Sequence, residues 1–176
     1  LFQHIDRLSR REPEYLLRKF NLSSADLIMG AERLARLFAE EDNLSLAPSL
    51  DQIREKFPIS EIPGGSLEKL ISALVDSKIG RADVPNAAIG DRRFAFAHRR
   101  YQEALFVRYL STHPESISPI KLLTENRWRE YTVTLLQTRE YEEFSDLLSH
   151  ATSILSECAS QDNFNYCGHP PLPSNI

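Results

Sequence analysis

The segment from Arg92 to Leu105 changes from the pattern of a β-strand to that of a helix, with no turn residue between the two. Phe94 and Phe96 alternate with smaller or charged neighbours, and apolar residues then recur at helical spacing from Tyr101 onward. His98 stands at the junction. The first turn of a helix presents unpaired backbone N–H groups and the positive end of the helix dipole. A basic junction of this kind indicates a place that can hold a phosphate group. The arginines of this segment are Arg92, Arg93, Arg99 and Arg100.

Helical spacing of apolar residues dominates the rest of the chain. A helix is predicted from about Ala25 to Glu41, in which Gly30 indicates a close contact with another helix. Ser24 and Ser66 are candidate N-caps, because a serine side chain can accept from an unpaired N–H group of the first turn. Other helices are expected at 1–10, 13–20, 49–57, 67–76, 98–111, 119–124, 127–138 and 141–159. Alternation indicates two short strands, 78–84 and 92–97, joined by a hairpin loop at 85–91.

The order helix, short helix, helix and hairpin between residues 25 and 97 is that of a winged helix, a three-helix core with a two-stranded β wing. After residue 97 the pattern is entirely helical, and successive helices with short loops predict a helical bundle or superhelical segment. The expected fold class is therefore mainly α. The expected divisions are a helical linker at 1–24, a winged-helix domain at 25–97, a helical (superhelical) domain at 98–160 and an irregular tail at 161–176.

Composition and charge exclude several classes of protein. The formal net charge of -4 argues against a general nucleic-acid binder, which usually presents a basic surface. No apolar run approaches the ~18 residues of a membrane span, and no signal peptide is visible. Cys158 and Cys167 form no Cys-x-x-Cys pair and match no common zinc spacing with nearby histidines, so we expect reduced thiols and no metal site. These features predict a cytoplasmic protein without a membrane partner.

The residues around His98 stand at offsets that are typical of one known family. They read Phe94-x-Phe96-x-His98-x-x-Tyr101-Gln102-Glu103-Ala104-Leu105, with Tyr109-Leu110 one turn further on. This set resembles the end of the winged-helix domain in NACHT-type signal-transduction NTPases, part of the larger STAND group. Trp128 and Glu130 are similar to residues of that family's first superhelical segment. Departures from the family pattern are Ala104, where an aromatic residue is frequent, and Phe106 and Val107, where small alanines are frequent.

The resemblance implies a role for each residue near the junction. His98 is the family histidine that contacts the β-phosphate of bound ADP in the closed state. Gln102 and Glu103 are implied to brace the interface to a neighbouring domain. Possible phosphate or interdomain contacts are Arg92, Arg93, Arg99 and Arg100.

The resemblance also implies that this chain is part of a larger switch. The family is controlled by ADP and ATP with magnesium, forms homo-oligomers on activation by a trigger protein, and serves in innate immunity, including defence against phage. This sequence contains neither the Gly-x-x-x-x-Gly-Lys-Ser/Thr phosphate loop nor an acidic magnesium motif. We therefore expect the NTPase core upstream of Leu1, and residues 1–8 indeed resemble the middle of an amphipathic helix.

Other interpretations remain open at the level of sequence. His98 also fits a helix-capping histidine bonded to the local backbone, and the four arginines also fit a solvated rim. No nucleophile–base pair, paired carboxylates or metal constellation stands out, so no catalytic residues are predicted and the chain itself is not expected to be an enzyme. One alternative function is a helical scaffold or adaptor for protein–protein interaction. A second is a DNA-binding winged-helix regulator, whose recognition helix would offer Glu68, Lys69 and Asp76 to the bases.

Overall fold

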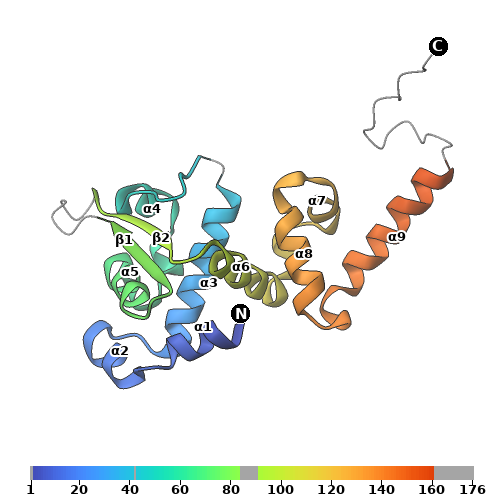
Figure 1. Ribbon diagram of the computed structural model, residues 1–176. Helices are drawn as coiled ribbons and strands as arrows, with labels where there is room; N and C mark the ends of the chain where they lie inside the picture. Colours follow the sequence, from blue (N-terminus) through green and yellow to red (C-terminus); the bar gives the residue numbers. More distant parts are fainter. Residues whose placement is uncertain (1, 42, 84–90, 161–176) are drawn as a thin grey trace, which may run out of the picture. The chain divides into compact units, whose positions relative to one another are not determined.

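The structure is a computed structural model of the chain, and it describes residues 2–41, 43–83 and 91–160. The chain divides into two compact units, the first ending at Ser116 and the second beginning at Ile117 (Figure 1). The helices of the first unit are α1 (Phe2–Ser9), α2 (Pro13–Phe20), α3 (Ser24–Glu40), α4 (Leu50–Lys56), α5 (Leu67–Asp76) and α6 (Arg99–Thr112). Its strands are β1 (Gly80–Asp83) and β2 (Arg93–Phe96). The helices of the second unit are α7 (Pro119–Thr124), α8 (Arg129–Thr138) and α9 (Ser145–Ser160).

Short 3₁₀ turns lie at Ile59–Glu61, Pro63–Gly65, Pro114–Ser116, Asn126–Trp128 and Tyr141–Phe144. The expected mainly helical fold with a small two-stranded antiparallel sheet is confirmed. The predicted hairpin loop at 85–91 and the predicted tail at 161–176 lie almost wholly outside the described residues; of the two, only Asp91 is described.

The strand β2 is bordered on both of its edges by other segments. On one edge it pairs with β1, with Gly80 opposite Phe96 and Asp83 opposite Arg93. On the other edge the chain just before α4 forms a bridge between Ser49 and Arg93. There the Leu50 N–H donates to the Arg92 carbonyl at 2.8 Å, and the Phe94 N–H donates to the Pro48 carbonyl at 3.0 Å. Three stretches of chain therefore lie side by side, with β2 in the middle.

Side-chain caps set where several helices begin. The predicted cap of α3 was wrong by one residue: Ser23, not Ser24, is the N-cap, and it forms a reciprocal capping box with Asp26. Ser24 instead donates to the carbonyl of Ser9 at 2.8 Å, which ties α3 to the end of α1. Ser66 caps α5 as predicted, since its side chain accepts from the N–H of Lys69. Ser49 caps α4 with a capping box of its own.

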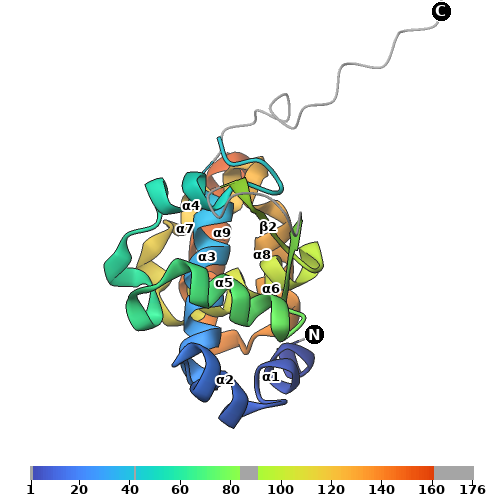
Figure 2. The same cartoon turned by 90° about the vertical axis from the view of Figure 1, so that its left-hand side faces the viewer.

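Gly30 lies where α3 meets α5, as the sequence predicted. A Cβ atom at this position would be 2.6 Å from Cδ1 of Leu70, closer than carbon atoms in real proteins approach. Leu70 is fully buried, and α5 packs on both α3 and α4 (Figure 2). The glycine therefore permits the close approach of two helices, and that approach offsets its unfavourable helix propensity.

Three phenylalanine rings fix the end of β2 against α3. Phe94 and Phe96 are buried, and their ring centroids are 5.4 Å apart. Phe38 of α3 meets both rings edge-on, at 6.1 Å from Phe94 and 5.7 Å from Phe96. Tilted and edge-to-face pairs of this kind are favourable beyond the area they bury. The strand that leads into His98 is thus held by its own side chains.

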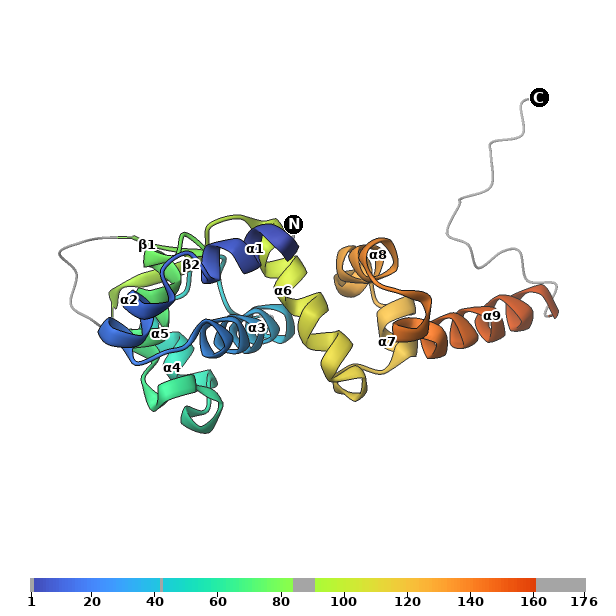
Figure 3. The same cartoon turned by 90° about the horizontal axis from the view of Figure 1, so that it is seen from below.

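The first compact unit is larger than the winged-helix region expected at 25–97. Helix α6 lies beside α3 (Figure 3), and Arg108 on α6 pairs with Glu32 on α3 at 2.9 Å and also with Asp6 on α1. Residues 1–24, expected as a linker, contribute Ile5 and other side chains to the core. These additional buried residues are Leu16, Phe20 and Leu22. The unit boundary therefore falls after α6 and not before it, because α3 needs α6 to cover its apolar face.

The second unit is held by local contacts among its three helices. Helix α7 packs on both α8 and α9. The Thr132 hydroxyl donates to the Leu122 carbonyl at 2.8 Å, and the Trp128 indole N–H donates to Glu125 at 3.1 Å. Trp128 is buried, as expected for a core residue.

Candidate functional site: the start of helix α6

His98 is the N-cap residue of α6, and its backbone is extended, with φ -137° and ψ 141°. Its carbonyl accepts from the Tyr101 N–H at 2.9 Å, but its side chain makes no capping hydrogen bond. The alternative of a histidine bonded to the helix it caps is therefore wrong. The imidazole is exposed and meets the buried Tyr101 ring edge-on, with centroids 5.1 Å apart and planes at 87°. The contact orients the ring without a hydrogen bond from the imidazole to its own helix.

Arg99 and Arg100 extend from the first turn of α6 and share one buried carboxylate. Arg99 Nε donates to Glu103 Oε1 at 3.1 Å, and Arg100 Nη1 lies 3.4 Å from Glu103 Oε2. The Glu103 side chain is only 5% exposed, whereas those of the two arginines are 76% and 69% exposed. A buried carboxylate is costly unless it is paired, so the arginines stabilise Glu103 and Glu103 in turn orients them. Their remaining N–H donors point to solvent.

Arg92 and Arg93 belong to a different surface. They lie at the beginning of β2, whereas His98 follows its end, so the strand separates the two groups. Arg93 Nη1 donates to the Ala47 carbonyl at 3.3 Å. Both arginines line a groove beside α5, together with Leu50, Glu68, Ile71, Ser72, Val75, Asp76 and Ala82. The structure therefore brings together His98, Arg99, Arg100, Gln102 and Glu103 of the predicted site residues, and places Arg92 and Arg93 elsewhere.

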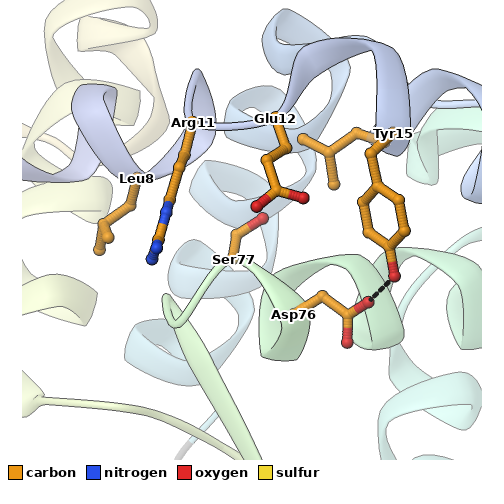
Figure 4. Close-up of a pocket in the computed structure, with 7 residues that line it drawn as sticks. Leu8, Arg11, Glu12, Tyr15, Asp76 and Ser77 are labelled. Atoms are coloured by element: carbon orange, nitrogen blue, oxygen red, sulfur yellow. Dashed lines mark hydrogen bonds between the residues drawn. The ribbon is translucent and has the colours of Figure 1, made fainter.

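A second small pocket, between α1, α2 and the end of α5, was not predicted. Figure 4 shows Arg11, Glu12 and Tyr15 on one side of the pocket, with Asp76 and Ser77 on the other, and Leu8 and Leu16 also line it. The Tyr15 hydroxyl donates to Asp76 at 2.9 Å, and Lys19 Nζ donates to the same carboxylate oxygen at 2.9 Å. Tyr15 and Asp76 are 61 residues apart, so no local sequence pattern links them.

The Asp76 cluster gives a prediction for stability against pH. The hydrogen bond from Lys19 holds the pKa of the Asp76 carboxyl below its ordinary value of about 3.9. Asp76 therefore contributes stability above that value and loses it as pH falls through the lower, folded-state pKa. We expect Asp76→Asn to cost at most about 1 kcal/mol at pH 7, since the group is 35% exposed, and less at pH 2. Urea unfolding at both pH values measures this, with Asp91→Asn as the control. An equal cost at pH 2 and pH 7 would contradict the ion-pair explanation.

In the described part of the chain, no group of three or more His, Cys, Asp or Glu residues is arranged to hold a metal ion. None of the helices described is both long and apolar enough to cross a membrane. Cys158 is exposed and free, and Cys167 lies outside the described residues.

Comparisons with protein-family models, curated proteins and solved structures find no match for this chain.

Proposed function

We propose that this chain is the regulatory winged-helix domain and first helical segment of a NACHT-type signalling NTPase, and that His98 latches its ADP-bound, inactive state. The observation that carries the proposal is the exposed His98 imidazole at the N-terminus of α6, with no bond to its own helix. A residue placed this way beside unpaired backbone N–H groups is suited to contact a phosphate. The nucleotide itself would be held by an NTPase domain elsewhere in the same polypeptide.

The topology of the first unit supports the winged-helix part of the proposal. Its elements follow the order α3, the bridge at Ser49, α4, α5 and then the β1–β2 hairpin. A winged helix has three helices in this order, a short extended segment after the first of them, and a hairpin whose second strand pairs with that segment. The chain then enters α6 directly at His98, as in the sequence motif that suggested the family.

The proposed mechanism is a change in contacts between two domains. With ADP bound, the His98 imidazole donates a hydrogen bond to the terminal phosphate, and the negative charge of the phosphate favours the protonated ring. Arg99 and Arg100 add positive charge at the same helix end, fixed by Glu103. Exchange of ADP for ATP moves the terminal phosphate and changes the affinity for the closed arrangement, so that the winged helix is released. Innate immunity or defence against phage would be the setting of such a switch.

A DNA-binding role is less well supported by the geometry of α5. Glu68 pairs with Arg54 and accepts from Ser66, and its pKa is lowered first by a backbone hydrogen bond and then by these two side-chain bonds. Asp76 pairs with Lys19. Arg54 and Lys19 are thus engaged with acidic groups of the same unit, whereas duplex binding requires cations directed at phosphates. The other alternative, a helical scaffold for protein–protein interaction, would use the same fold. Unlike the proposed switch, a scaffold would need no nucleotide.

The release rate of ADP from the complete polypeptide tests the proposal. His98→Ala removes one hydrogen bond to a charged group, worth about 1.5–3 kcal/mol, and should speed ADP release by roughly 10- to 100-fold. Fluorescent ADP displaced by excess unlabelled ADP reports this rate. His98→Gln keeps a hydrogen-bond donor, so its rate of ADP release should lie between those of the unaltered polypeptide and His98→Ala. His150→Ala, on the exposed surface of α9, serves as the control. Unchanged ADP release in His98→Ala would refute the latch.

A further inference from the structure

We propose that His4 on α1 is a second ligand-binding histidine, and that His4 and His98 together contact one diphosphate across the Tyr101 ring. The geometry of this pair stands independently, but the identification of the ligand as the diphosphate of ADP rests on the proposed function. No local sequence pattern connects His4 with His98, because 94 positions separate the two histidines.

Tyr101 brings the two histidines to one place. The His4 ring centroid lies 6.0 Å from that of Tyr101, with the planes tilted by 41°. The His98 centroid lies 5.1 Å from the same ring. Tyr101 is only 7% exposed, whereas both histidines are exposed. An exposed histidine from α1 and the exposed histidine at the start of α6 therefore both contact one buried aromatic ring.

The position of His4 is fixed by the packing of α1. Ile5, the next residue, is fully buried, and Asp6 pairs with Arg108 of α6. Ser24 donates to the carbonyl of Ser9 at the end of the same helix. Helix α1 is therefore attached to both α3 and α6, and these contacts hold the backbone of His4 in place near Tyr101. A preorganised donor loses less conformational entropy on binding than a free side chain.

The charges near the pair favour an anion. The nearby carboxylates are already engaged: Asp6 with Arg108, and Glu103 with Arg99 and Arg100. Among the described residues, neither imidazole has a hydrogen bond or an ion pair. Arg7, one turn after His4, is exposed and adds a further positive charge. A diphosphate offers several acceptor oxygens, so each imidazole can donate to a different one, and hydrogen bonds to a charged acceptor are stronger than neutral ones.

Histidine NMR on the 176-residue chain tests this inference with pyrophosphate as the probe. We expect the Cε1–H resonances of His4 and His98 to shift together, with one common midpoint, while those of His113 and His150 stay fixed. Inorganic phosphate, which offers fewer acceptor oxygens, should bind more weakly than pyrophosphate. His4→Ala should weaken pyrophosphate binding about three- to tenfold and leave thermal unfolding unchanged, because the side chain is exposed. His150→Ala is the matched control.

Three outcomes would overturn the inference. If His98 shifts while His4 does not, His4 is not a ligand, and the proposed latch through His98 still stands. If every exposed histidine shifts to the same extent, the effect is general ionic strength and not a site. If neither His4 nor His98 responds to millimolar pyrophosphate, the pair binds no diphosphate by itself. The proposed function is then judged separately, by ADP release from the complete polypeptide carrying His98→Ala.

Discussion

A fragment that ends at Ala97 is expected to lose the cooperative unfolding transition that a fragment ending at Ser116 retains. Helix α6 supplies four fully buried side chains and covers α3, whose own apolar face is also buried. The four are Ala104, Leu105, Phe106 and Val107. Burial of one large apolar side chain stabilises by about 1.5–3 kcal/mol, and a whole domain is stable by only about 5–15 kcal/mol. Removal of the helix therefore takes away most of the stability of the first unit.

Thermal unfolding followed by circular dichroism distinguishes the two fragments. The fragment 1–116 should show one sigmoidal transition, and the fragment 1–97 a gradual loss of helix with strong binding of a hydrophobic dye. A further fragment, 25–116, tests the contribution of α1 and α2, which bury Ile5, Leu16 and Phe20. A cooperative transition in 1–97 equal to that of 1–116 would contradict the placement of α6 in the first unit.

Phe94→Ala is expected to lower the free energy of unfolding by about 3–5 kcal/mol, the range for removal of a buried phenylalanine ring. The ring is fully buried and meets both Phe38 and Phe96. Chemical denaturation of the 176-residue chain measures the loss. Leu46→Ala is the control, since Leu46 is 89% exposed and its substitution should change stability by less than about 0.5 kcal/mol. A loss below about 1 kcal/mol for Phe94→Ala would show that the ring is not part of a packed core.

Gly80 provides a second variant that tests the same packing. A Cβ atom at Gly80 would overlap the edge of the Phe94 ring. Gly80→Ala is therefore expected to destabilise the chain by about 1–3 kcal/mol through overpacking. The cost should shrink in a Phe94→Leu background, where the space is freed, with a coupling energy of about 0.5–3 kcal/mol. Additive effects of the two substitutions would contradict the contact between β1 and the ring.

The periodicity of apolar residues was sufficient to predict the helices and the hairpin. Amphipathic helices such as α3 and α5 show one buried stripe, and this stripe is visible in the sequence. The start of α3 was missed by one residue, because Ser23 and Ser24 are both suitable caps and only the capping box with Asp26 decides between them. The contact at Gly30 could be predicted because an interior helical glycine is unfavourable without a packing reason.

The extent of the first unit could not be predicted in the same way. The apolar residues of α6 predict a helix, but this helix is buried on nearly all sides, so its sequence does not indicate which neighbour it covers. The ion pairs of Arg108 with Asp6 and Glu32 join segments that are far apart in the chain. The domain boundary predicted before His98 therefore depends on the family motif, whereas the boundary between the two compact units depends on tertiary packing.

The candidate site was predicted in part. His98 could be found because a strand passes into a helix there without a turn residue. The roles of its neighbours depend on contacts that spacing does not reveal, such as the buried Glu103 between two exposed arginines. The contact of His4 with Tyr101 joins residues near the two ends of the first unit, and no local sequence pattern could predict it. Arg92 and Arg93 were grouped with His98 only because they are near in sequence, and β2 separates them in space.

The central claim is that His98 contacts a nucleotide phosphate, and a structure of the complete polypeptide with ADP tests it most directly. The distance to measure is that between a ring nitrogen of His98 and the nearest oxygen of the terminal phosphate. The latch predicts a hydrogen-bond separation of about 2.7–3.2 Å in the ADP-bound state. A bound ADP whose phosphates are contacted only by other residues, with the His98 ring directed into solvent, would contradict the proposal.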